Sequence, residues 1–104
     1  MLTVTTQSIA EHNITKTLGL VRGGTVRSKH IGTDIVASLR NLVGGEQTGY
    51  TSLLAGAREQ ALDRMIAEAE KMGADAVVGL RMETSTIASG ASEIIAYGTA
   101  VKLD

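Results

Sequence analysis

The chain has 104 residues, of which 43% are hydrophobic and 20% are charged, and its formal net charge is −1. This length fits one globular domain over residues 1–104 and excludes two, since single domains most often span about 100–150 residues. The absence of Cys excludes disulfides, thiolate metal sites and thiol chemistry. With no Phe or Trp and only two Tyr, the core should be thin, and association between subunits would help to cover it.

The distribution of charge and apolar residues also bears on location and partners. Residues 1–13 do not place a basic flank before an apolar stretch, and no apolar run approaches the roughly 20 residues of a membrane-spanning helix. We therefore expect a cytoplasmic protein with no membrane partner. Lysines and arginines are scattered among a slight excess of acids, so the charge pattern of a nucleic-acid-binding protein is missing.

The first regular segment, residues 14–28, alternates between two sets of side chains as an extended strand does. It is interrupted by Gly23-Gly24. Tight hairpin turns need positive φ angles, which glycine adopts without strain. The glycine pair therefore predicts a β-hairpin centred on this point.

The middle of the chain has the period of two helices. Apolar residues recur over residues 35–43 at helical spacing, with Thr33 or Asp34 as the N-terminal cap and Gly44-Gly45 as the end. Residues 46–49 should form a short polar loop. A second helix is predicted from Thr51 to Met72, with a stripe of small and apolar residues, and Gly73 should end it.

Two strands, residues 76–86 and 92–103, are predicted to close the chain, joined by a loop at residues 89–90. Both faces of the last strand are apolar or small, and a strand buried on both faces needs a second cover. Another subunit is the expected source of that cover. Because Gly79 would need to be small against a neighbouring backbone or helix, Gly79→Val is predicted to destabilise the fold or the assembly.

Taken in order, several fragments resemble the YbjQ-like family, also called the putative heavy-metal-binding domain family. The similarity covers nearly the whole chain and rests on residues 18–21 (LGLV), 34–45 (DIVASLRNLVGG), 57–62 (AREQAL), 73–80 (GADAVVGL) and 98–101 (GTAV). The resemblance implies an α+β, dodecin-like subunit with a small antiparallel sheet covered by two helices. It also implies assembly into a homopentameric ring. No ligand set of the family can be carried over residue by residue.

The family description makes metal binding the first chemistry to consider. His30 and Asp34 have the i, i+4 spacing of a two-ligand site for a metal such as zinc. However, Asp34 falls at the predicted helix start, which leaves His30 outside the helix, and we favour an exposed loop histidine. Met65 and Met72 lie seven residues apart on the helix stripe and are best interpreted as core residues, while Met82 falls in a strand and Met1 at the terminus. We favour a structural role for all four over metal ligation, because nothing converges on them at ligand spacing.

Small anions are the second candidate ligand. Arg22, Arg27 and Lys29 surround the predicted turn, and a ring would repeat them once per subunit to give an anion-attracting surface. The alternative interpretation, which we prefer, is a solvated hairpin tip. For catalysis, Ser28 and His30 are nearly adjacent in sequence, and such neighbours rarely form a nucleophile–base relay.

The sequence as a whole therefore predicts a non-enzymatic, cytoplasmic homo-oligomer of the YbjQ-like type, with other copies of itself as partner and no cofactor. The alternative prediction is a ring that binds a metal ion or a small anion.

Overall fold

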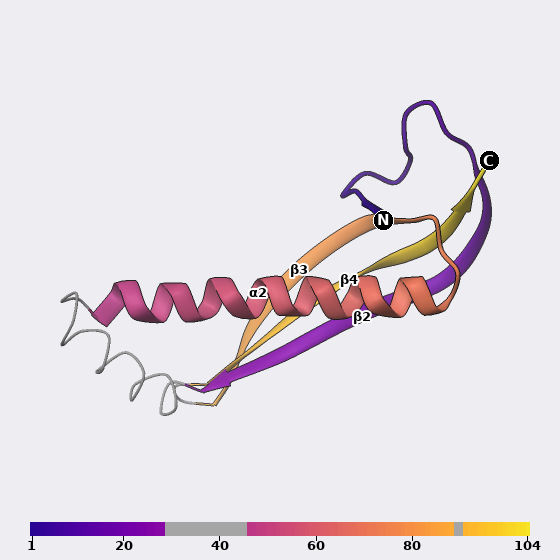
Figure 1. Cartoon of the computed structure of the whole chain (residues 1–104). Helices are drawn as coiled ribbons and strands as arrows, with labels where there is room; N and C mark the ends of the chain where they lie inside the picture. Colours follow the sequence, from indigo (N-terminus) through magenta and orange to yellow (C-terminus); the bar gives the residue numbers. More distant parts are fainter. Residues whose placement is uncertain (29–45, 89–90) are drawn as a thin grey trace.

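One long helix lies along one face of a four-stranded sheet in the computed structural model, which describes residues 1–28, 46–88 and 91–104 (Figure 1). The elements in chain order are β1 (Leu2–Thr3), β2 (Ile14–Ser28), α2 (Glu46–Lys71), β3 (Ala76–Ala88) and β4 (Ala91–Leu103). The fold is α+β, as predicted, and both C-terminal strands lie where they were expected. The first predicted helix lies outside the described residues, so the structure shows one covering helix.

The sheet has the strand order β1-β3-β4-β2 and is mixed rather than fully antiparallel. The central strand β4 runs antiparallel to both β2 and β3. The short β1, however, pairs with β3 in parallel through Leu2 and Thr3. The prediction of an antiparallel sheet was wrong at this edge because a two-residue strand is too short to show an alternating pattern.

The predicted hairpin at Gly23-Gly24 is also wrong, since β2 continues through both glycines. They pair with Ala96 and Ile95 of β4, and neither has a positive φ angle. Gly23 instead allows a close crossing of α2. A Cβ atom at this position would collide with the carbonyl oxygen of Ala61 and the backbone nitrogen of Met65.

The long helix was predicted over residues 51–72 and is found over Glu46–Lys71. The predicted loop at residues 46–49 is therefore part of the helix; a single glycine such as Gly49 costs only about 1 kcal/mol in a helix and does not end it. The helix ends at Gly73 as predicted. Gly73 has φ +76°, its N–H donates to the carbonyl of Glu70 at 3.0 Å, and the N–H of Ala74 donates to the carbonyl of Ala69 at 3.1 Å, a Schellman arrangement.

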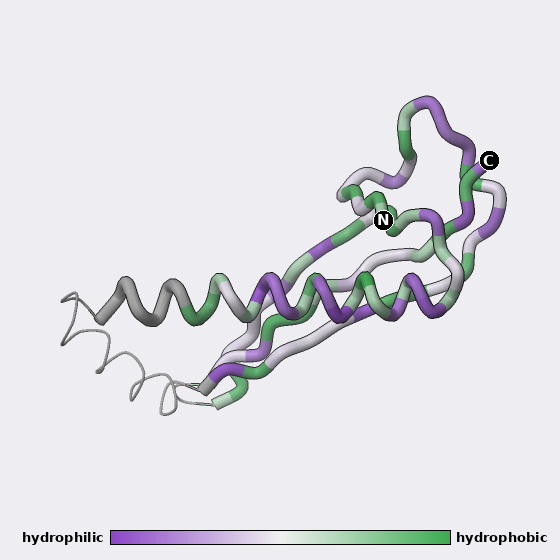
Figure 2. The backbone as a smooth tube through the Cα atoms, in the orientation of Figure 1, coloured by the Kyte–Doolittle hydropathy of each residue, from purple (hydrophilic) through white to green (hydrophobic). Residues whose placement is uncertain are grey.

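The main core lies between α2 and the sheet. Hydrophilic and hydrophobic stretches alternate along α2 (Figure 2), as expected for a helix with one buried face. That face consists of small residues and one methionine at four-residue intervals, all fully buried: Ala57, Ala61, Met65 and Ala69. Opposite them lie Val21 of β2, Val77 of β3, and Ile94, Ala96 and Ala100 of β4.

Polar contacts also fix the helix against β2. The buried hydroxyl of Thr25 donates to the carbonyl of Ala57 at 3.2 Å, and Nη1 of Arg64 donates to the carbonyl of Gly24 at 2.6 Å. Small residues and short polar bonds thus replace the aromatic packing that the chain lacks.

A second, smaller core lies on the opposite face of the sheet, near both termini. It contains Ala76, Val78 and Val101, and Val4 and Ile9 pack against them. These two residues belong to residues 1–13, which we call the N-terminal segment. Backbone bonds hold this segment to β3: the N–H of Val4 donates to the carbonyl of Val77 at 2.9 Å, and the N–H of Leu80 donates to the carbonyl of Val4 at 3.0 Å. The N-terminal segment therefore covers one end of this face.

Gly79 lies at a register shift of β3 and has φ +64°. Its N–H donates to the carbonyl of Thr6 at 2.8 Å. A Cβ atom here would meet no atom within 4 Å. The packing reason that the sequence suggested for this glycine was therefore wrong in the described part of the chain, and the position instead needs a left-handed backbone conformation.

The molecule is elongated, with extents of 53 × 25 × 20 Å and a radius of gyration of 16.9 Å, above the roughly 13 Å of a compact 100-residue domain. Within the described ranges, no helix is long and apolar enough to cross a membrane.

Candidate functional site

The sheet face that points away from α2 is one candidate surface. Residues paired directly across a sheet point to the same side, and neighbours along a strand alternate. The register therefore places side chains of three strands on this side, which we call the open sheet face: Leu20, Arg22 and Val26 of β2, Arg81 and Glu83 of β3, and Ile95 and Tyr97 of β4. Leu20 and Val26 are 65% and 53% exposed, so the N-terminal segment does not cover this part of the face.

Polar side chains cross the open sheet face in one row. Arg22 of β2 pairs with Tyr97 of β4, which pairs with Arg81 of β3. The Tyr97 hydroxyl donates to Oε1 of Glu83 at 2.8 Å. Nη1 of Arg81 donates to the carbonyls of Thr5 and Leu80 at 2.9 and 2.8 Å, which ties this guanidinium to the N-terminal segment.

The surroundings of Tyr97 determine what this row can do. The hydrogen bond to Glu83 raises the pKa of the Tyr97 phenol above its ordinary value of 10.0, and desolvation and the charge of Glu83 act in the same direction, while Arg81 opposes them. At neutral pH the phenol is therefore protonated and acts as a hydrogen-bond donor rather than as a base. Together with the two guanidinium groups, the row can contact a polar or anionic group.

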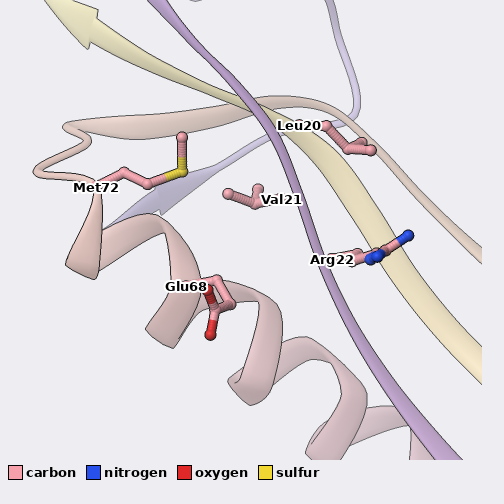
Figure 3. Close-up of a pocket in the computed structure, with 5 residues that line it drawn as sticks. All are labelled: Leu20, Val21, Arg22, Glu68 and Met72. Atoms are coloured by element: carbon pink, nitrogen blue, oxygen red, sulfur yellow. The ribbon is translucent and has the colours of Figure 1, made fainter.

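A hollow of about 350 Å³ lies along the outer edge of β2 and is lined by Leu20, Val21, Arg22, Glu68 and Met72. In Figure 3, Val21 points from β2 toward α2, whereas Leu20 and Arg22 point to the other side of the strand. The hollow therefore follows the strand edge rather than entering the core.

A second hollow of about 320 Å³ lies between the N-terminal segment and the sheet. Its lining has no ionisable side chain and consists of Gln7, Ile14, Thr17, Val78, Gly79, Thr99 and Val101. The polar side chains of this lining, Gln7, Thr17 and Thr99, can form hydrogen bonds but carry no charge.

The structure separates the predicted anion-binding residues. Arg22 lies on the open sheet face, whereas Arg27 lies on the helix side of β2, where its Nη2 donates to Oε1 of Gln60 at 2.6 Å. The continuous strand explains the separation, because residues five apart in a strand point to opposite faces. Lys29 lies outside the described residues.

The predicted metal ligands His30 and Asp34 also lie outside the described residues. Among residues 1–28, 46–88 and 91–104, no group of three or more His, Cys, Asp or Glu side chains is arranged to hold a metal ion. Met65 is fully buried in the core, as its position on the helix stripe predicted. The same prediction was wrong for Met72, which is 40% exposed beside the hollow at β2, at the end of the helix.

Sequence reasoning missed the row formed by Arg81, Glu83 and Tyr97. The alternation of the last strand did place Tyr97 on the side of Ile95. Nothing local indicated that Glu83 would reach it, because the register shift between Val78 and Arg81 decides which β3 residues face Tyr97. That shift depends on Gly79 and on the N-terminal segment.

Comparisons with known proteins confirm the family resemblance. The model of the family YbjQ_1, described as "Putative heavy-metal-binding", matches residues 1–104. A UPF0145 protein of Methanosarcina acetivorans is 56% identical over 103 residues, which cover 99% of this chain and 97% of the relative. A UPF0145 protein of Photobacterium profundum is 58% identical over 99% of this chain and 100% of its own length.

Among solved structures, the fold is similar to that of a protein of unknown function of the DUF74 family from Pediococcus pentosaceus. The TM-score is 0.68 at 15% identity, and the match covers 100% of this chain and 98% of the other. That similarity concerns the fold alone. Since the family model and the relatives match end to end, this chain belongs to the YbjQ family.

Proposed function

We propose that this chain is the subunit of a non-enzymatic, cytoplasmic homo-oligomer, a pentameric ring whose assembly is the working form. The observation that carries the proposal is the open sheet face, on which Leu20 and Val26 are 65% and 53% exposed. Covering apolar surface stabilises an assembly by about 25 cal/mol per Å². A thin, elongated subunit has more to gain from such cover than a compact one.

The same face supports the non-enzymatic part of the proposal. Its polar row consists of two arginines, which cannot act as bases at neutral pH, and of Tyr97, which already donates to a carboxylate. A nucleophile needs a base within hydrogen-bond reach. Glu83 does accept the Tyr97 hydroxyl at 2.8 Å, but this contact raises the pKa of the phenol and so favours the neutral hydroxyl over a tyrosinate nucleophile.

Light scattering tests the proposal directly. The wild-type protein is expected to have five times the subunit mass, and the double variant Leu20→Lys/Val26→Lys is expected to be smaller, because it places two charges on the open sheet face. Ala67→Lys, on the exposed side of α2, is the control and should keep the wild-type mass. A wild-type protein that stays monomeric at micromolar concentration would refute the proposal.

The alternative function is binding of a small anion or a metal ion by the assembled ring. The observation that favours an anion is the exposed Arg22 in the same cross-strand row as Arg81. Calorimetry with inorganic phosphate should then give saturable heat that Arg22→Ala abolishes. Arg27→Ala, which removes the same charge from the other face, is the control. For a metal ion, calorimetry with zinc should give saturable heat that His30→Ala removes. If neither phosphate nor zinc gives saturable heat, both ligands are excluded.

A further inference from the structure

The hollow of about 320 Å³ between the sheet and the N-terminal segment lies at the end of the molecule where both termini are found (Figure 1). Its buried side chains are Val78 of β3 and Val101 of β4. Three polar side chains lie around them, from Thr17 of β2, Thr99 of β4 and Gln7 of the N-terminal segment. One chain supplies all of these groups, so the hollow is formed within a single subunit.

Both outer strands are irregular at the level of this hollow. The pairing of β4 with β2 shifts after Thr17, and its pairing with β3 shifts after Val78. Both shifts fall within residues 97–101 of β4. Each contains a glycine with a positive φ angle, +135° at Gly19 and +64° at Gly79. Because bulges often lie next to functional sites, where they re-aim side chains, two of them at one level mark this place as a candidate binding site.

Recognition in this hollow depends on side chains rather than on the backbone. Among the hydrogen bonds of the described residues, none engages the side chain of Gln7, Thr17 or Thr99. Each threonine hydroxyl can donate and accept, and the glutamine amide can do both as well. The N–H of Gly79, by contrast, already donates to the carbonyl of Thr6 at 2.8 Å.

An uncharged ligand fits this lining better than an ion does. A charged group placed here would lose hydration without gaining a partner of opposite charge, since the lining has no ionisable side chain. Val78 and Val101, only 6% and 1% exposed, provide an apolar surface. The volume is at the lower end of the roughly 300–1,000 Å³ of small-molecule pockets. These properties specify a small molecule with an apolar body and an amide or hydroxyl group.

We propose that this hollow binds a small uncharged molecule of that kind. Its apolar body contacts Val78 and Val101, and its polar group forms hydrogen bonds with Thr17, Thr99 or Gln7. This binding goes beyond the proposed function and does not depend on the oligomeric state, because the lining comes from one chain.

The N-terminal segment should respond to such a ligand. Its residues 7–11 form no backbone hydrogen bond with the described strands of the sheet. On either side of this stretch, Thr6 is bonded to Gly79 and Asn13 is bonded to Asp104. A ligand that contacts this stretch and β4 together favours the closed segment, so opening of the segment becomes rarer when the ligand is bound.

An NMR titration with two matched probes tests the proposal. δ-Valerolactam is an uncharged ring with one amide, and 5-aminovalerate is its ring-opened form, which carries an ammonium and a carboxylate. The lactam should shift the backbone amide signals of Gly79, Thr99 and Val101 in a saturable manner, while 5-aminovalerate should not. The lactam should also slow hydrogen exchange of the Gly79 N–H, because its acceptor belongs to the N-terminal segment.

Conservative variants identify the contacts. Thr99→Val and Thr17→Val nearly keep the side-chain shape and remove one hydroxyl. At least one of them should raise the Kd of the lactam roughly three- to tenfold, as expected for one lost hydrogen bond. Thr86→Val, on the exposed far part of β3, is the matched control and should bind as the wild type does. The amide spectrum of each variant shows whether the fold is kept.

Several results would overturn the proposal. Shifts that grow linearly with lactam up to tens of millimolar, a range that reaches even weak ligands, would show that there is no site. Equal binding of 5-aminovalerate would show that the site does not select uncharged molecules. A Kd unchanged in both threonine variants would place the lactam elsewhere. Unchanged exchange of the Gly79 N–H at saturating lactam would overturn the role of the N-terminal segment.

Discussion

At the scale of single residues, two adjacent glycines have different roles. Gly23 lies under α2, where a Cβ atom would collide with the backbone of Ala61 and Met65 and lie 2.7 Å from Cβ of Arg64. A helix backbone cannot move aside as a flexible side chain can, so the cost is that of an overpacked core. Gly23→Ala should lower the free energy of unfolding by about 1–3 kcal/mol, measured by urea denaturation at fixed protein concentration.

Gly24→Ala provides the matched control. A Cβ atom at Gly24 would approach only the carbonyl oxygen of Ile94, at an ordinary contact distance of 3.7 Å. Its stability should therefore be close to that of the wild type. Equal losses for the two variants would contradict the helix-crossing explanation and would instead fit a turn that needs both glycines.

Gly79 provides a test between conformation and packing. With φ +64° and no atom within 4 Å of a built Cβ, substitution should cost backbone strain rather than a collision. Gly79→Ala is expected to lose about 1–2 kcal/mol. Gly79→Asn should lose less although it is larger, because asparagine adopts this conformation more readily, and Gly79→Val should lose the most. If urea denaturation shows Gly79→Asn to be less stable than Gly79→Ala, the cost at this position comes from packing and the conformational explanation is wrong.

At the scale of elements, Asp75 connects the start of β3 to the end of β4. Its Oδ2 accepts the N–H of Leu103 at 2.8 Å, and its Oδ1 lies 3.5 Å from Nζ of Lys102. The backbone hydrogen bond from Leu103 lowers the pKa of Asp75 below 3.8, and Lys102 adds to this effect against the opposing influence of desolvation. The carboxylate therefore stabilises the fold above about pH 4, and this contribution is lost as the pH falls through the lowered pKa.

Asp75→Asn should accordingly be less stable than the wild type at neutral pH and should lose less stability on acidification. Urea midpoints measured between neutral pH and about pH 2.5 check both statements. A residual acid dependence is expected, because hydrogen bonds from Asn13 also lower the pKa of Asp104. Asp63→Asn, on the exposed side of α2, is the control and should follow the wild type. If the urea midpoint of Asp75→Asn falls with decreasing pH as steeply as that of the wild type, Asp75 is not the stabilising carboxylate.

How far the elements could be predicted depended on how local their signals were. The stripe Ala57, Ala61, Met65 and Ala69 repeats often enough to identify the buried face of α2, and Gly73 ends the helix through bonds to the preceding turn. Gly23-Gly24 is ambiguous, because a turn and a close helix crossing both favour glycine. The choice between a turn and a helix crossing depends on which strand pairs with these glycines, and no local pattern in the sequence indicates that strand.

The candidate site was less predictable for the same reason. The row from Arg22 through Tyr97 to Arg81 joins three strands, and its register depends on the shift at Gly79. That shift is supported by the N-terminal segment through Thr6, where the sequence has no periodic pattern. Side chains that meet across strands depend on such long-range contacts, which a single sequence does not encode locally.

At the scale of the whole molecule, an assembly that covers the open sheet face couples folding to association. A partner that binds only the folded subunit stabilises that subunit, so the melting temperature rises as the concentration of the partner rises. For a pentamer, a tenfold increase in protein concentration adds about 1 kcal/mol per subunit, which corresponds to a rise in Tm of roughly 4–8 °C for a domain of this size. Scanning calorimetry over a hundredfold range of concentration measures this rise.

The same measurement on Leu20→Lys/Val26→Lys separates assembly from subunit stability. Both side chains are more than half exposed in the subunit, so their replacement should change the fold of one chain by little, whereas two buried charges would oppose association. The variant should therefore have a Tm that is lower and nearly independent of concentration, while Ala67→Lys keeps the wild-type dependence. A wild-type Tm that does not change with concentration would mean that the subunit is stable with its apolar face uncovered, and the open sheet face would then need another partner.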